Sequence, residues 1–300
     1  MKNQKFFLIF LVVCLTHSSG GAKIVVVYPI CSKSHILAVM PAVEELGKRG
    51  HQVTVFSPFK GIAKNVPNSR EVFLPVIAKM LDEAQIDWFA MQKQGPTQVF
   101  SMLPFIKDVG MLGGDYIFKH HEFLDIVNKR DVDLFIVDGM FNEFLYPVFD
   151  LIGVPFVTHS SSSVFPVVLQ AMGAPIDYAA VPTGLVEFDD HMTFFQRLMN
   201  IIPNEIFNVV RTHYIIKDQD KLVQSHFPNA RPIAEVEGEV SICIVNSNPM
   251  TNWPRSLPPT IVPVGALHTR PAEPLPKVRK LFKCCKPKVP NLNISIVHRN

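Results

Sequence analysis

The sequence predicts an α/β domain built around a doubly wound parallel sheet. Short runs of β-branched and apolar residues alternate with longer segments in which apolar residues recur every three or four positions. Such alternation of strands and helices is typical of a parallel sheet that has helices on both faces. With 48% hydrophobic and 18% charged residues among 300, the chain can bury a large core.

The first unit of this pattern runs from Lys23 to Ser57. Residues 24–27 form a continuous β-branched run, as expected of a strand that is buried on both faces. From His35 onward the apolar residues follow the helix period, at Ile36, Val39, Met40, Val43 and Leu46. Gly50 suits the left-handed residue that ends a helix, and residues 51–56 then form the next strand.

The remaining elements are predicted from the same periodicities. We expect further strands at 71–75, 132–137, 155–158, 240–245 and 260–264. We expect helices at 78–92, 96–109, 115–129, 142–152 and 191–227. Because proline lacks the amide hydrogen that a helix interior needs, Pro104 should kink or split one helix and Pro203 should break another.

Three predicted loops leave the carboxyl ends of strands, at residues 30–35, 138–140 and 159–163. Ligands of doubly wound sheets bind beyond these strand ends, so we expect the three loops to be neighbours. His35 begins a helix, where the positive end of the helix dipole keeps an imidazole neutral and able to accept a proton. It is a candidate general base, although an ordinary surface or capping histidine is the alternative.

Asp138 ends a buried strand at the same edge of the sheet. A carboxylate in this place can accept the ring N–H of a nearby histidine and stabilise the imidazolium that forms. The alternative is a turn formed by the Asp-Gly dipeptide.

Other chemistries lack their motifs. Ser160–Ser163 are not part of a Gly-x-Ser-x-Gly elbow, and the chain has no glycine-rich phosphate loop. Two Asp-x-Asp patterns, at 131–133 and 218–220, agree with chance, so we expect no metal and no bound cofactor. After residue 270 the chain has seven Lys or Arg against one acid, which accounts for its positive net charge of +3. The folded body therefore gives no reason to expect a nucleic-acid partner.

The two ends of the chain differ from its body. Residues 1–22 have the basic start, apolar core and small residues of a secretory signal peptide. They predict the secretory pathway, either the lumen of the endoplasmic reticulum or secretion, and no later stretch is long enough to span a membrane. We therefore expect a signal peptide at 1–22, a folded domain at 23–270, and a linker with a disordered basic tail at 271–300.

Helices inserted between strands often build a pocket over the edge of a sheet. The helices predicted between residues 78 and 129 are rich in Met, Phe and Leu. Side chains that could line such a pocket are Trp88, Met91, Phe100, Met102 and Phe105. Packing in an ordinary helix core is the alternative for each of them.

Several short motifs follow one another in a specific order. They are Ser34-His35 before a helix, Gly50–Phe56, Asp133–Asp138, Leu151–Phe156, Val245–Ser247, Pro254–Pro259 and Val264–His268. Together they resemble the N-terminal half of the animal UDP-glycosyltransferases, the UDP-glucuronosyltransferase-like family. The resemblance implies the Rossmann-like N-terminal domain of a GT-B glycosyltransferase, in which one domain binds the acceptor and a second binds the UDP-sugar.

The resemblance also implies a reaction and its residues. The family transfers a hexose or glucuronic acid with inversion to a hydroxyl of a small lipophilic acceptor, a reaction of detoxification. His35 matches the catalytic histidine of the family and Asp138 its partner. Residues expected near the acceptor are Ser34, Phe100, Met102, Phe105, Ser160 and Ser161.

The sequence departs from the family after Pro274–Pro276. Full-length members continue into the donor domain with its Thr-His-Gly-Gly-type signature, whereas Lys277–Lys288 is a basic run. UDP-sugar is then a co-substrate whose main binding domain lies outside this sequence, and we expect no turnover by the chain alone. The alternative is a non-catalytic truncated isoform that binds lipophilic ligands or pairs with full-length UDP-glycosyltransferases.

Overall fold

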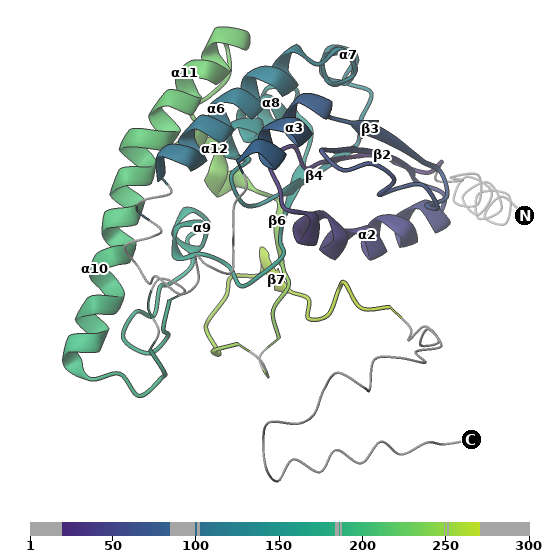
Figure 1. Cartoon of the computed structure of the whole chain (residues 1–300). Coiled ribbons are helices and arrows are strands. Elements are labelled where there is room, and N and C mark those ends of the chain that lie inside the picture. The colour runs from purple at the N-terminus through teal and green to yellow at the C-terminus, as the bar shows by residue number, and fades with distance from the viewer. Residues whose placement is uncertain are drawn as a thin grey trace, which may run out of the picture. The chain divides into compact units, whose positions relative to one another are not determined.

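The described part of the computed structural model is a seven-stranded parallel sheet with helices on both faces (Figure 1). The structure describes residues 20–84, 100, 103–183, 186, 188–248, 250 and 252–270. The strands are β1 (Lys23–Val27), β2 (Gln52–Ser57), β3 (Ser69–Phe73), β4 (Leu134–Asp138), β5 (Phe156–Ser160), β6 (Ile242–Val245) and β7 (Ile261–Pro263). Their order is β3-β2-β1-β4-β5-β6-β7, so the chain winds outward in one direction from β1 and in the other direction from β4. The predicted Rossmann-like, doubly wound fold is confirmed.

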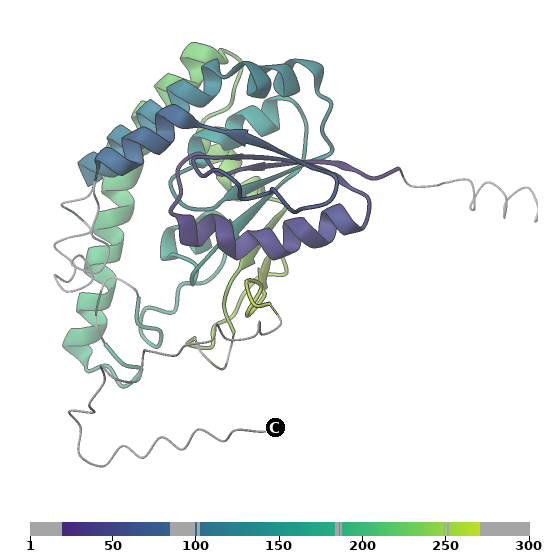
Figure 2. The same cartoon turned by 45° about the vertical axis from the view of Figure 1, so that its right-hand side comes forward.

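The helices of the described residues connect these strands. They are α2 (Lys33–Lys48), α3 (Pro75–Glu83), α6 (Leu103–Lys119), α7 (His121–Lys129), α8 (Tyr146–Leu151), α9 (Pro166–Ala171), α10 (Phe194–Val210), α11 (Lys217–His226) and α12 (Ile233–Val236). Shorter helical turns lie at Glu143–Leu145 and Glu237–Glu239. Helix α2 covers one face of the sheet, and α3, α6 and α7 cover the other, as Figures 1 and 2 show from two directions.

Alternation along β1 and β4 divides the core between the two faces. Ile24 and Val26 of β1 pack with α2, whereas Val25 and Val27 pack into the larger cluster on the opposite face. In β4 the residues Phe135 and Val137 belong to that larger cluster. Since successive side chains of a strand point to opposite faces, Asp138 lies on the face that α2 covers.

One predicted boundary is wrong because tertiary packing overrides a local signal. Helix α6 continues through Gly113 and Gly114, where we expected a break. The two glycines have a packing role instead, because side chains added there would collide with Ile30, Leu222 and Phe144. Glycine thus allows this helix to approach its neighbours closely. Pro104 is the second residue of α6, which is described from Leu103 onward, and the helix that it was expected to kink or split lies partly outside the described residues, so that prediction stays a prediction.

A similar correction applies farther along the chain. Pro203 lies inside the continuous helix α10 and does not break it. The irregular stretch comes later, where Arg211–Ile216 form a π-helical segment between α10 and α11. Strand β5 also extends to Ser160, so His159 and Ser160 belong to the sheet and not to a loop.

The described chain up to His268 forms one compact unit. Most of the predicted signal peptide and the whole of residues 271–300 lie outside the described residues, as do Trp88, Met91 and Met102. Among the helices that the structure describes, none combines the length and the apolar character needed to cross a membrane.

The C-terminal end of α2 provides a test of this packing. A side chain at the buried Gly47 would collide with the backbone carbonyl of Pro67, and Asn68 already donates a hydrogen bond to the Gly47 carbonyl at 3.0 Å. Helix propensity alone would make Gly47→Ala more stable by about 1 kcal/mol. We expect a net loss of about 1 kcal/mol or more in urea unfolding, because overpacking against a backbone atom costs roughly 1–3 kcal/mol. A variant at least as stable as wild type would show that α2 does not dock as described.

Candidate active site at the carboxyl edge of the sheet

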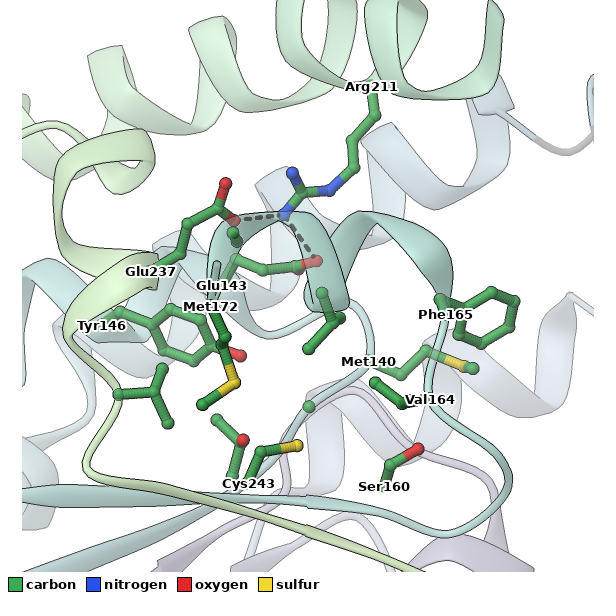
Figure 3. A pocket seen from close by; sticks show the side chains of 15 residues that line it. Met140, Glu143, Tyr146, Ser160, Val164, Phe165, Met172, Arg211, Glu237 and Cys243 are labelled. Carbon is green, nitrogen blue, oxygen red and sulfur yellow. Dashed lines mark hydrogen bonds and ion pairs between the residues drawn. The ribbon is translucent and has the colours of Figure 1, made fainter. Parts of the chain in front are cut away.

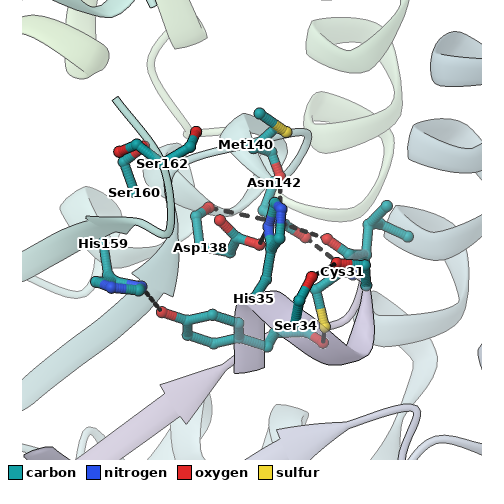
Figure 4. Close-up of polar contacts among 12 residues, drawn as sticks. Cys31, Ser34, His35, Asp138, Met140, Asn142, His159, Ser160 and Ser162 are labelled. Carbon is teal, nitrogen blue, oxygen red and sulfur yellow. Dashed lines mark hydrogen bonds and ion pairs between the residues drawn. The ribbon is translucent and has the colours of Figure 1, made fainter. Parts of the chain in front are cut away.

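His35 and Asp138 meet where the winding of the sheet reverses. His35 is the third residue of α2, just after the loop that leaves β1, and Asp138 is the last residue of β4. The parallel pairing of β1 with β4 brings the two together, and Nδ1 of His35 lies 2.7 Å from Oδ2 of Asp138 (Figure 4). The two residues that the sequence placed at one edge are therefore in direct contact.

Burial gives the two side chains different properties. The Asp138 side chain is 1% exposed and the His35 ring is 19% exposed. Burial raises the pKa of Asp138, and the hydrogen bond from His35 opposes this effect without cancelling it. An ionised carboxylate can only accept a hydrogen bond, so the hydrogen of His35 lies on Nδ1 and Nε2 is the basic nitrogen. In this state Nε2 carries a lone pair and no hydrogen, so it is chemically able to accept a proton.

A second histidine lies beside this pair but cannot take the same role. His159 is directly opposite Asp138 in the sheet register, is fully buried, and has Nδ1 3.0 Å from the hydroxyl of Tyr28. Burial, assisted by His35, lowers its pKa to about 4, so the ring is neutral at physiological pH. Because sequence reasoning placed His159 in a loop, it missed this neighbour.

A pocket begins at the turn that follows Asp138 and extends along the ends of β4, β5 and β6 (Figure 3). It contains about 490 Å³ of space between atoms, including open solvent. Most of its wall is apolar, formed by Met140, Tyr146, Val164, Phe165, Val168, Ala171, Met172 and Val240. Thr158, Ser160 and Cys243 contribute small polar groups from the sheet.

One wall of the pocket carries a buried ion cluster. Nη2 of Arg211 donates to Oε1 of Glu143 at 3.1 Å and to Oε2 of Glu237 at 2.8 Å. Burial alone would lower the pKa of Arg211, but the two carboxylates raise it above its ordinary value. One guanidinium against two carboxylates leaves this wall with a net charge of −1 when both are ionised. The cluster also ties the π-helical segment to the turns at Glu143–Leu145 and Glu237–Glu239.

Residues 22–285 match the protein family described as UDP-glucoronosyl and UDP-glucosyl transferase. The chain belongs to this family. The matched range extends past His268, where the resemblance recognised in the sequence ends.

Relatives within the family include insect and mammalian enzymes. UDP-glycosyltransferase UGT5 of Dactylopius coccus is 25% identical over 259 residues, which cover 84% of this chain and 48% of its own length. Human UDP-glucuronosyltransferase 2B7 is 24% identical over 289 residues, which cover 88% of this chain and 52% of the length of the human protein. The chain thus spans about half the length of the curated relatives it matches.

Solved glycosyltransferases are also similar to this chain. CalG4, the calicheamicin glycosyltransferase, has a TM-score of 0.47 at 14% identity, covering 82% of this chain and 53% of its own. The glycotransferase of kitacinnamycin has a TM-score of 0.45 at 14% identity, and the match covers 86% of this chain and 54% of the solved chain.

The side chains that the sequence suggested for the acceptor lie in different places in this member of the family. Ser160 lines the pocket, and Ser34 is exposed beside His35 with its hydroxyl 2.8 Å from that of Ser32. The Ser161 carbonyl accepts a hydrogen bond from Asn246. Phe100 and Phe105 pack in helix cores, which was the alternative considered for both. Met102 lies outside the described residues.

Sequence reasoning missed the charged and apolar residues of the pocket wall. Met140 and Glu143 follow Asp138 closely, but Arg211 and Glu237 are distant in the sequence and meet them only in the fold. A single arginine near the end of an apolar helical segment was the available signal for Arg211.

The raised pKa of Asp138 predicts an unusual effect on stability. A carboxyl whose pKa is higher in the folded than in the unfolded state destabilises the fold when it is ionised. Asp138→Asn should therefore raise the midpoint of thermal unfolding at neutral pH. The gain should shrink as the pH falls through the raised pKa, because the wild-type carboxyl then takes up a proton.

Asp115→Asn is the matched control, because the pKa of Asp115 is shifted in the opposite direction. Hydrogen bonds from Lys119 and His226 lower the pKa of Asp115, so its ionised form stabilises the fold above the unfolded pKa. This variant should lower the midpoint at neutral pH. A lower midpoint for Asp138→Asn as well would contradict our description of the Asp138 environment.

Proposed function

We propose that this chain carries the acceptor-binding and proton-accepting part of an inverting UDP-glycosyltransferase. The observation that carries the proposal is the contact between the partly exposed ring of His35 and the buried carboxylate of Asp138, at 2.7 Å. This arrangement orients the ring and directs its basic nitrogen away from the carboxylate. Membership of the UDP-glycosyltransferase family supports a sugar transfer as the reaction that uses it.

The proposed reaction is a single displacement. Nε2 of His35 takes the proton of the acceptor hydroxyl as the acceptor oxygen bonds to the anomeric carbon of the sugar. The bond from that carbon to the phosphate oxygen breaks at the same time, and UDP leaves with the electron pair. One displacement from the opposite face inverts the anomeric centre. The carboxylate of Asp138 stabilises the positive charge that His35 acquires.

The pocket supports a small lipophilic acceptor. Its wall is mainly aliphatic, aromatic and thioether surface, which favours apolar groups, and the wall includes Gly139, the residue that follows Asp138. The negative cluster of Glu143, Arg211 and Glu237 disfavours an anion in the same space. A neutral hydroxy compound, such as a phenol or an alcohol, therefore suits the site best.

UDP-sugar is the co-substrate in this proposal, either a UDP-hexose or UDP-glucuronic acid. The chain spans about half the length of its curated relatives, so the activity of those whole proteins is a proposal for it. The signal-like residues 1–22 support a place in the secretory pathway.

A second candidate is a non-catalytic protein that holds lipophilic ligands or pairs with full-length relatives. One observation favours it: this chain by itself supplies a pocket whose wall is mainly apolar.

The first test is His35→Ala. Transfer from UDP-glucose or UDP-glucuronic acid to 1-naphthol should be measured with the purified chain alone and mixed with a full-length relative whose own catalytic histidine is replaced. Loss of a general base should reduce transfer by about 10²–10⁴-fold. His191→Ala is the control, because the His191 side chain is 90% exposed and lies next to Asp190, away from Asp138.

The outcome separates the two candidates. Transfer that survives His35→Ala would exclude the proposed base. If sugar is transferred neither by the chain alone nor by its mixture with the full-length relative, but calorimetry shows that the chain binds 1-naphthol, the non-catalytic candidate is supported.

The second test concerns the charge of the ligand. The chain should bind 1-naphthol at least about tenfold more tightly than 1-naphthoate, because the carboxylate would lie near a negatively charged wall. Glu237→Gln removes one of those charges and should improve naphthoate binding with little effect on naphthol. Glu239→Gln, whose native carboxylate pairs with Arg231, is the control. Equal affinities for the two ligands in wild type would show that the pocket is not the acceptor site.

A further inference from the structure

A single buried amide joins the loop that precedes His35 to the turn that follows Asp138. Asn142 is fully buried, and its Oδ1 accepts from the backbone N–H of Ile30 at 3.1 Å. Its Nδ2 donates to the carbonyl of the same Ile30 at 2.9 Å (Figure 4). One side chain therefore satisfies both backbone groups of a residue that lies 112 positions away.

The same amide closes the turn after β4. Nδ2 of Asn142 also donates to the carbonyl of Met140 at 2.7 Å. Between them Phe141 adopts a positive φ of 66°, a conformation that is unfavourable for a bulky side chain. Backbone strain of this kind persists only when the surrounding contacts enforce it, and the Asn142 amide is such a contact.

The loop after β1 is held from a second direction. The side chain of Ile30 packs on Gly113 of α6 so closely that an added Cβ there would collide with its Cδ1. Only four residues separate Ile30 from His35. The backbone N–H of His35 already donates to the Ser32 carbonyl at 3.1 Å, in the first turn of α2. The position of Ile30 consequently determines where the His35 ring starts relative to Asp138.

We infer that Asn142 is a positioning residue that holds His35 and Asp138 in their hydrogen-bonded arrangement before any substrate binds. The inference rests on the proposed function only for the use of the pair, and not for the geometry itself. Asparagine suits the task because its amide offers an acceptor for the N–H of Ile30 and two donor hydrogens for the carbonyls of Ile30 and Met140. Alanine offers neither, and aspartate would place an oxygen against both carbonyls. Nδ2 of Asn142 also lies 3.5 Å from the backbone carbonyl of Asp138.

The test measures the tautomer of His35 by the chemical shifts of its two ring nitrogens in ¹⁵N-histidine-labelled protein at a pH where the ring is neutral. His35→Gln assigns the signals, and Asp138→Asn shows the shifts of the ring without its carboxylate. In wild type the hydrogen should lie on Nδ1, whereas a histidine without a partner favours Nε2. Asn142→Ala should raise the ratio of the Nε2–H to the Nδ1–H form by about tenfold, because the ring is then free to leave the carboxylate.

Asn200→Ala is the matched control. Asn200 is also fully buried and bonds by its amide to the backbone of a distant loop, at Thr183, Val181 and Tyr178, but it does not contact the loops of His35 or Asp138. It should destabilise the protein without changing the His35 tautomer. If Asn142→Ala does not fold, Gly113→Ala displaces Ile30 from the other side and should produce the same change.

The inference is overturned if the His35 tautomer is the same in the folded Asn142→Ala and wild-type proteins, or if Asn200→Ala changes it equally. It is also overturned if Gly113→Ala leaves the tautomer unchanged when Asn142→Ala does not fold. Since no sugar transfer is measured, a failure of the proposed function, seen as transfer that survives His35→Ala, remains a separate result.

Discussion

The pairing of β1 with β4 is the constraint on which the candidate site depends. Chain segments diverge from this pair in opposite directions, so no crossover helix lies over the strand ends at the switch point. Val27 and Val137 are in register, which places the loop after β1 and the last residue of β4 at the same level. Side-chain alternation then turns Asp138 toward the face that α2 covers, where His35 lies in the first turn of that helix. A slip of one residue in β4 would turn its carboxylate into the opposite core.

Burial, more than residue type, assigns the roles of the ionisable groups at this edge. Two histidines lie beside Asp138, but only His35 combines a hydrogen bond to the carboxylate with an exposed ring. His159 is sealed in the sheet with its Nδ1 on Tyr28, and its lowered pKa removes it from proton transfer near neutral pH. Hydrogen bonds from His35 and from the backbone of Met140 stabilise the ionised form of Asp138, but burial still raises its pKa. A single positive charge next to Asp138 is therefore favoured, and our proposal places it on His35.

The sequence was sufficient for the fold and for the place of the central pair because both follow from local signals, whereas the roles expected of the pair came from the family resemblance. Strand and helix periods define the alternating units, and a residue at the carboxyl end of a parallel strand must lie at the ligand edge, as His35 and Asp138 do. Features that arise from contacts between distant segments could not be predicted in this way. The buried amide of Asn142 has its partners on Ile30, which is distant in the sequence. Similarly, α6 needs glycine at position 113 because the side chain of Ile30 packs closely against it. The ion cluster around Arg211 likewise joins three separate segments.

The two faces of the sheet separate the proposed chemistry from the proposed specificity. Asp138 and His159 point to the α2 face, whereas Thr158, one residue before His159, lines the pocket on the other side. The faces meet at the carboxyl edge, in the turn from Gly139 to Asn142. That turn contributes Met140 to the pocket and Asn142 to the support of His35. Substitutions on the pocket wall, around Arg211 or Phe165, can therefore change which ligand binds without moving the base, whereas a change in this short turn affects both at once.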